Sequence, residues 1–176
     1  MVNNKGDMIK RALNSGLIFG ICSIIISIIG YSFPDIQSGL SILSYTSLTL
    51  CCVFAMKWYR DKDQNGYLTF KQGLAVGMLA VVGFAILSGA FSFIYIKMNP
   101  EVVDDMIDLM VVEWEKAGLS DSQIEMSLSI TEKMLTPFGI LISSVVTFSI
   151  IGLIINLITA VILKKDKPVF EELDQN

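Results

Sequence analysis

Residues 61–72, DKDQNGYLTFKQ, have the residue types and the spacing of a calcium-binding loop. Side chains with oxygen atoms stand at the first, third and fifth positions (Asp61, Asp63 and Asn65), and glycine stands at the sixth (Gly66). These are the opening positions of an EF-hand loop, in which side-chain oxygens coordinate Ca²⁺ and the glycine permits a sharp turn.

The twelfth position of the loop argues against calcium. An EF-hand requires a bidentate carboxylate there, whereas this chain has Gln72, whose amide offers one neutral oxygen. Lys62 and Lys71 add positive charge to the loop. A turn accounts for the same residues, because Asn65-Gly66 is a strong turn signal. We therefore regard calcium as an unfavoured ligand, and we expect that the acids of the loop can be removed with little effect.

The remaining residues offer no catalytic or metal-binding pattern. The chain has no histidine, which is the commonest metal ligand and the commonest general base. Its three cysteines (Cys22, Cys51 and Cys52) lie in apolar segments, which suits neither a disulfide framework nor a zinc site. We expect a protein that is not an enzyme, with no catalytic, cofactor-binding or metal-binding residues and no cofactor.

Long segments without charge indicate that the elements around this loop cross a membrane. The 176 residues are 53% hydrophobic and 17% charged, and their mean hydropathy is +0.62. A helix of roughly 20 apolar residues crosses a hydrocarbon core of about 30 Å. Asp, Glu, Lys and Arg are absent from four segments: 12–33, 38–56, 72–96 and 136–163.

We therefore predict an all-α fold, an integral membrane four-helix bundle that forms a single membrane domain over residues 1–176. The predicted spans cover about residues 12–33, 38–58, 71–97 and 137–163. Between the third and fourth spans, residues 99–135 are predicted to form an extracytoplasmic helical hairpin.

The distribution of lysine and arginine predicts the orientation of the spans. Ten of these 13 residues lie before the first span, between the second and third spans, or after the fourth; the other three are Lys97, Lys116 and Lys133. By the positive-inside rule, both termini and the 61–72 loop are cytoplasmic. The 99–135 segment and the short connection at Pro34 and Asp35 then face outward.

The outward segment has the signals of two helices. Gly118 is a plausible helix stop, and Ser120 with Gln123 forms a capping box that opens a second helix. Residues 97–135 carry nine acidic residues and three lysines, a net charge of −6, which suits a solvated surface but leaves partner or cation binding open. An apolar stripe at steps of three and four residues consists of Val103, Met106, Met110, Trp114 and Ala117.

Small residues follow one face of the first and third spans. Because little hydrophobic force joins helices in lipid, small residues that allow close backbone approach mark packing faces. Asn156, the most polar side chain well inside a span, is expected to bond across helices. The sequence does not decide whether the packing partner lies in the same chain. The small residues are Gly16, Gly20, Ser23, Ser27 and Gly30 in the first span and Gly73, Gly77, Ala85 and Gly89 in the third.

Three stretches together resemble a known family. They are KWYRDKDQNGYLTFKQGLAVG at the middle loop, IDLMVVEWEKAGLSDSQIE in the outer segment and ILKKDKP after the last span. In order and spacing they are similar to the bacterial "domain of unknown function 4199" family, over roughly residues 10–168. The resemblance implies a small integral protein of the bacterial cytoplasmic (inner) membrane, and it carries no established activity or functional residue.

Three functions from different classes remain open at this level. The first is a non-catalytic component that binds partner proteins through its spans or its outer acidic hairpin. The second is a small oligomeric transporter or lipid-carrier helper for neutral or lipid cargo, since the spans lack the charged residues that ion-coupled pathways need. The third is an intramembrane enzyme. The expected partners are the lipid bilayer and a membrane protein or a second copy of the chain, and no nucleic acid.

Overall fold

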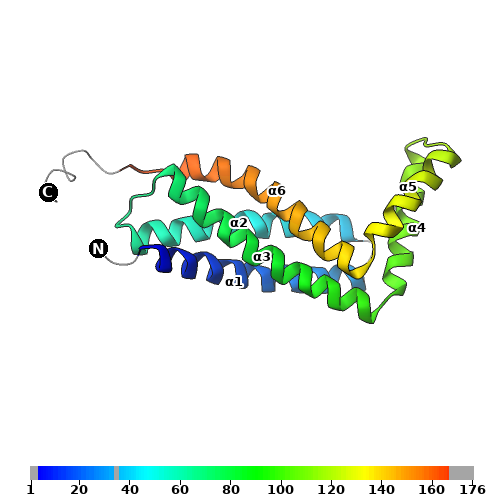
Figure 1. Cartoon of the computed structure of the whole chain (residues 1–176), viewed down its shortest axis with the longest axis horizontal. Helices are drawn as coiled ribbons and strands as arrows, with labels where there is room; N and C mark the ends of the chain where they lie inside the picture. The colour runs from blue at the N-terminus through cyan, green and yellow to red at the C-terminus, as the bar shows by residue number, and fades with distance from the viewer. Residues whose placement is uncertain (1–3, 34–35, 167–176) are drawn as a thin grey trace, which may run out of the picture.

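The computed structural model describes residues 4–33 and 36–166, which form helices and no strand. The helices are α1 (Asn4–Ser32), α2 (Gln37–Asp63), α3 (Phe70–Met98), α4 (Glu101–Lys116), α5 (Asp121–Met134) and α6 (Pro137–Leu163). The prediction of an all-α fold is confirmed. Figure 1 shows α1, α2, α3 and α6 side by side in an elongated bundle, with α4 and α5 projecting from one end. The predicted connection at Pro34 and Asp35, and Lys167 among the basic residues, lie outside the described residues.

Three of the described helices, α1, α3 and α6, are long and apolar enough to cross a membrane. The membrane character of the protein therefore agrees with the prediction. The fourth predicted span corresponds to α2, which has 27 residues but a more polar composition. Serine and threonine are frequent in it, and its last turns carry the charged run KWYRDKD. Whether α2 also crosses the membrane stays a prediction.

Small residues bring α1 and α3 into close contact. A methyl group added to Gly16 would lie 2.7 Å from the carbonyl oxygen of Ala80 and 3.0 Å from the backbone nitrogen of Phe84. Two helical turns further along, the hydroxyls of Ser23 on α1 and Ser88 on α3 lie 2.7 Å apart. Residue numbers increase together along both helices, so α1 and α3 run parallel. The small residues of the first span therefore form a packing face, and its partner lies in the same chain.

The small residues of α3 contact α6, which runs in the opposite direction. A methyl group on Gly73 would lie 3.3 Å from the Cβ of Ala160, near the end of α6. Earlier in α6, a methyl group on Gly152 would lie 2.6 Å from the side chain of Val81. Because α3 therefore uses separate small residues for α1 and α6, it is the central helix of the bundle.

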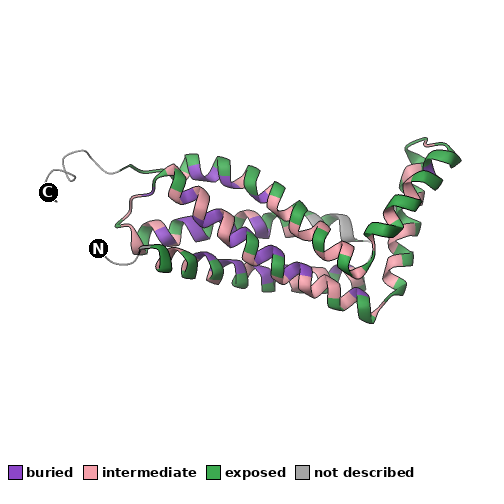
Figure 2. Ribbon diagram, viewed as in Figure 1, coloured by how far each residue is buried: buried purple, intermediate pink, exposed green. Residues whose placement is uncertain are grey.

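The tightest packing lies in the half of the bundle nearer the N-terminus (Figure 2). The largest fully buried side chains are there or at mid-bundle, among them Tyr59, Met56 and Phe84. Cys51 and Cys52 are buried in this core as free cysteines, whereas Cys22 is exposed on α1. The half of the bundle next to α4 and α5 is less densely filled.

Candidate functional site

The 61–72 segment does not have the layout of a calcium loop. Asp61 and Asp63 lie in the last turn of α2, so the connection to α3 is limited to residues 64–69. Asn65 and Gly66 take positive φ angles of 52° and 85°, which confirms the turn predicted at this pair. An EF-hand would instead direct these oxygens toward one central point.

The two carboxylates at the end of α2 are paired with arginines. Asp63 accepts hydrogen bonds from Nε of Arg11 at 3.0 Å and from its Nη2 at 3.4 Å. The same guanidinium lies 4.9 Å from the ring centre of Trp58, a cation–π contact. Asp61 accepts a hydrogen bond of 2.7 Å from Arg60, which lowers the pKa of the Asp61 carboxyl. This pairing argues against the expectation that both acids can be removed with little effect, because Asp63 joins α2 to α1.

Gln72, at the position where a calcium loop needs a carboxylate, caps α3 instead. Its Oε1 accepts from the backbone N–H of Thr69 at 3.0 Å, and its own backbone N–H donates to Oγ1 of Thr69. Gln64 donates a 3.0 Å hydrogen bond to the hydroxyl of the buried Tyr59. Among the described residues no group of three or more His, Cys, Asp or Glu side chains could hold a metal ion.

Backbone hydrogen bonds connect the 61–72 segment to Lys165, just after the end of α6. The N–H of Leu68 donates to the carbonyl of Lys165 at 2.8 Å, and the N–H of Lys165 donates back at 2.9 Å. The ammonium of Lys165 also lies 5.6 Å from the ring centre of Tyr67. The 61–72 segment, which resembles a calcium loop in sequence, thus connects α1, α2, α3 and α6 at one end of the bundle and has a structural role.

Asn156, the polar residue expected to bond across helices, is fully buried in α6. Its Nδ2 lies 3.5 Å from the sulfur of Met78 on α3, so the contact does cross helices but is weak. Its Oδ1 has no hydrogen-bond partner among the described residues and lies against the backbone of Gly77. Asn156 is not among the lining residues of either cavity at the other end of the bundle.

The opposite end of the bundle carries the α4–α5 hairpin, by which we mean residues 101–134. The α4 helix ends at Lys116, and Gly118 just beyond it marks the predicted stop: its φ is +78° and its backbone N–H donates to the carbonyl of Glu115. Ser120 and Gln123 form the predicted capping box that begins α5, with Oε1 of Gln123 2.9 Å from the backbone N–H of Ser120. Local sequence therefore accounts for the turn, where α4 ends and α5 begins.

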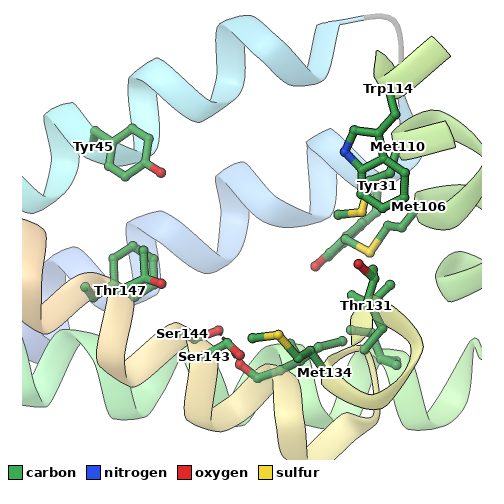
Figure 3. A pocket seen from close by; sticks show the side chains of 14 residues that line it. Tyr31, Tyr45, Met106, Met110, Trp114, Thr131, Met134, Ser143, Ser144 and Thr147 are labelled. Carbon is green, nitrogen blue, oxygen red and sulfur yellow. Dashed lines mark hydrogen bonds between the residues drawn. The ribbon is translucent and has the colours of Figure 1, made fainter. Parts of the chain in front are cut away.

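A cavity of about 560 Å³, which we call the main cavity, lies where this hairpin meets the bundle (Figure 3). Figure 3 shows Tyr45 and Thr147 on facing helices at one end, with Met106, Met110 and Trp114 together at the other. Three of the residues predicted as the apolar stripe of α4 thus line a cavity rather than a closed core. All of its lining residues are Tyr31, Tyr45, Ile96, Met106, Met110, Trp114, Thr131, Met134, Leu135, Ile140, Ser143, Ser144, Thr147 and Phe148.

A smaller cavity of about 370 Å³ adjoins the main cavity and shares Tyr31 and Met106 with it. It differs in charge, because Asp105 and Asp108 are part of its wall. Its other lining residues are Gly30, Val102 and Leu109. Sequence reasoning did not identify either cavity, since their walls come from segments far apart in the chain.

A family model described as "Protein of unknown function (DUF4199)" matches residues 14–165. The match covers most of the chain, including the middle loop, the hairpin and the end of α6, and it confirms the resemblance seen in these stretches. No curated protein and no solved structure matches the chain.

Proposed function

The chain belongs to the DUF4199 family, whose function is unknown, and we propose that it is a four-span membrane protein that binds a partner protein without catalysis. In this proposal the α4–α5 hairpin stands outside the membrane and carries the binding surface. The membrane is the bacterial cytoplasmic membrane, and both termini are cytoplasmic.

The parallel packing of α1 and α3 supports four spans. If both helices cross the membrane in the same direction, the chain must return across it between Ser32 and Phe70. The 27 residues of α2 lie in this interval, and at 1.5 Å per residue they extend about 40 Å. Residues 38–56 of α2 contain no charged side chain. The α2 helix therefore supplies the return, although its serine and threonine content lowers its hydropathy.

The positions of basic residues support the orientation. Nine described lysines and arginines lie near the bundle end formed by the start of α1, the end of α2, the start of α3 and the end of α6 (Figure 1). Lys97, Lys116 and Lys133 lie at the other end or on the hairpin. The positive-inside rule assigns the first end to the cytoplasm.

Exposed apolar side chains on the hairpin are the observation that carries partner binding. Val112 is 43% exposed, Met126 68% and Ile130 57%. These apolar side chains lie on a hairpin that projects from the end of the bundle, in a segment (residues 97–135) with a net charge of −6. Acidic residues are repelled by anionic head groups, so the membrane surface is an unfavourable cover for these side chains. A protein partner would remove them from water.

Site-specific photo-crosslinking in native membranes tests this function. We expect benzoylphenylalanine at Val112 and at Ile130 to form an adduct with the same protein, because neither residue lines the main or the smaller cavity and both are exposed. The matched control is Ile25, which is 54% exposed on α1 and faces lipid in this proposal. Partner binding by the hairpin is wrong if both hairpin positions give only the lipid adducts that Ile25 gives.

A second candidate function is the handling of a neutral or lipid cargo, alone or in an oligomer. The main cavity favours it, because its volume lies within the range of about 300–1,000 Å³ that small-molecule sites occupy and its walls are largely apolar.

A further inference from the structure

The two adjoining cavities, which we call together the compartment, share Tyr31 and Met106 in their walls and differ in chemical character. The main cavity offers a largely apolar surface with three methionine side chains (Met106, Met110 and Met134), which adapt to ligands of irregular shape. The smaller cavity lies on the other side of Tyr31 and Met106 and has the carboxylates of Asp105 and Asp108 in its wall. A ligand that fills both must therefore be apolar at one end and polar at the other.

The position of the compartment fits a membrane lipid. The main cavity is lined on one side by the α4–α5 hairpin and on the other by parts of α1, α2, α3 and α6, which are membrane-embedded in the four-span arrangement. Tyr45 and Met134 in its wall are 44% and 53% exposed, so the cavity opens to the surroundings of the bundle. Asp105 and Asp108 lie four and seven residues beyond Glu101, within about 10 Å of the start of α4 at 1.5 Å per residue. They are therefore at the level of the lipid head groups.

Charge selects the head group. Among the described residues no lysine or arginine lines either cavity, and neither Asp105 nor Asp108 has an ion pair. Lys116, the nearest lysine along α4, pairs with Glu113 at 2.8 Å. An anionic head group would meet only like charge there, whereas an ammonium group would gain two acceptors three residues apart on one helix face.

We propose that this compartment binds one lipid of the outer leaflet with a primary ammonium in its head group. An acyl chain occupies the main cavity, and the ammonium group lies between Asp105 and Asp108. The proposal rests on the four-span arrangement but not on partner binding by the hairpin, because the purified protein alone supplies every residue involved.

The two tryptophans provide the readout. Trp114 lines the main cavity, whereas Trp58 lies at the other end of the bundle beside Arg11. A Trp58→Phe variant leaves Trp114 as the sole reporter, and Trp114→Phe leaves Trp58 as the internal control. Bromine atoms on an acyl chain quench the fluorescence of a tryptophan only in contact with it, so brominated lipids report which lipid occupies the cavity.

The experiment uses reconstituted protein in phosphatidylcholine vesicles with a small fraction of brominated phosphatidylethanolamine, phosphatidylglycerol or phosphatidylcholine. We expect brominated phosphatidylethanolamine to quench Trp114 with an apparent affinity about twofold to fivefold above that of the other two, the range for exposed ion pairs. Trp58 should show no such preference. The double variant Asp105→Asn with Asp108→Asn should lose the preference at Trp114.

The proposal is overturned if the three brominated lipids quench Trp114 equally, or if the preference survives in the Asp105→Asn, Asp108→Asn variant. Both aspartates are exposed, so this variant keeps the fold, and Trp58 emission of the same double substitution in the Trp114→Phe background verifies that. Because no partner is present in the vesicles, this result is independent of the crosslinking result.

Discussion

Replacing Gly16 with alanine is expected to destabilise the protein in detergent by about 1–3 kcal/mol, the usual cost of overpacking. The new methyl group would meet the carbonyl oxygen of Ala80 at 2.7 Å and the backbone of Gly83 at 3.2 Å. Backbone atoms of a helix cannot rotate away as a side chain can. The α1 and α3 helices must therefore separate, and the dispersion contacts along their whole interface weaken.

Two other glycines give matched controls for Gly16→Ala. Gly39 has no atom within 4 Å of an added methyl group, so Gly39→Ala should leave the stability unchanged or raise it, since alanine favours helix. Gly20 would meet the end of the Leu87 side chain at 2.9 Å, which can turn aside, so Gly20→Ala should cost less than Gly16→Ala. Thermal unfolding in detergent measures all three. Equal midpoints for Gly16→Ala and Gly39→Ala would show that α1 and α3 are not in close backbone contact.

Removing the carboxylate of Asp63 is expected to destabilise the protein by about 1–3 kcal/mol, the range for a hydrogen bond to a charged group. The Asp63 side chain is 12% exposed and that of Arg11 29%, so the pair is less screened by water than a surface ion pair. Asp63→Ala leaves the guanidinium of Arg11 partly buried without its acceptor. Thermal unfolding in detergent again measures the loss.

Asp61→Ala is the matched control for Asp63→Ala. Asp61 is 47% exposed and forms its ion pair only with its neighbour Arg60 among the described residues, so its removal should change the stability by less than about 0.5 kcal/mol. Calcium should not alter the unfolding midpoint of the wild type, because a ligand stabilises only the folded state that binds it. A calcium-dependent rise in the midpoint that disappears in Asp63→Ala would restore the calcium interpretation.

Local sequence signals predict the helices of this protein well. Composition identifies the apolar segments, and the glycine at 118 with the capping box at Ser120 and Gln123 marks the hairpin turn. The helices nevertheless extend beyond the apolar segments: α1 begins at Asn4 rather than near residue 12, and α2 continues to Asp63. Charged residues leave the hydrocarbon region but remain helical, since Lys, Arg and Glu favour helix as much as leucine does.

Contacts between helices are what the sequence alone could not predict. The EF-hand pattern suggested that Asp61 and Asp63 share a ligand, but Arg11, some 50 residues earlier, takes one of them. Small residues indicate that a helix packs closely, but not against which helix, because every span offers a suitable face. The two cavities are even less accessible to sequence reasoning, since residues from Tyr31 to Phe148 meet in the wall of the larger one.

Accessibility of two engineered cysteines tests the four-span arrangement most directly. In a variant with Cys22, Cys51 and Cys52 replaced by alanine, single cysteines at Lys62 and at Glu115 are treated in intact cells with an impermeant thiol reagent. Both positions are exposed in the structure, so a lack of labelling reports the membrane barrier rather than burial. With four spans, we expect labelling at position 115 in intact cells and labelling at position 62 only after the cells are permeabilised. If α2 did not cross the membrane and the N-terminus stayed inside, position 62 would be outside and position 115 inside. Labelling of intact cells at position 62 with protection at position 115 would therefore contradict the four-span arrangement.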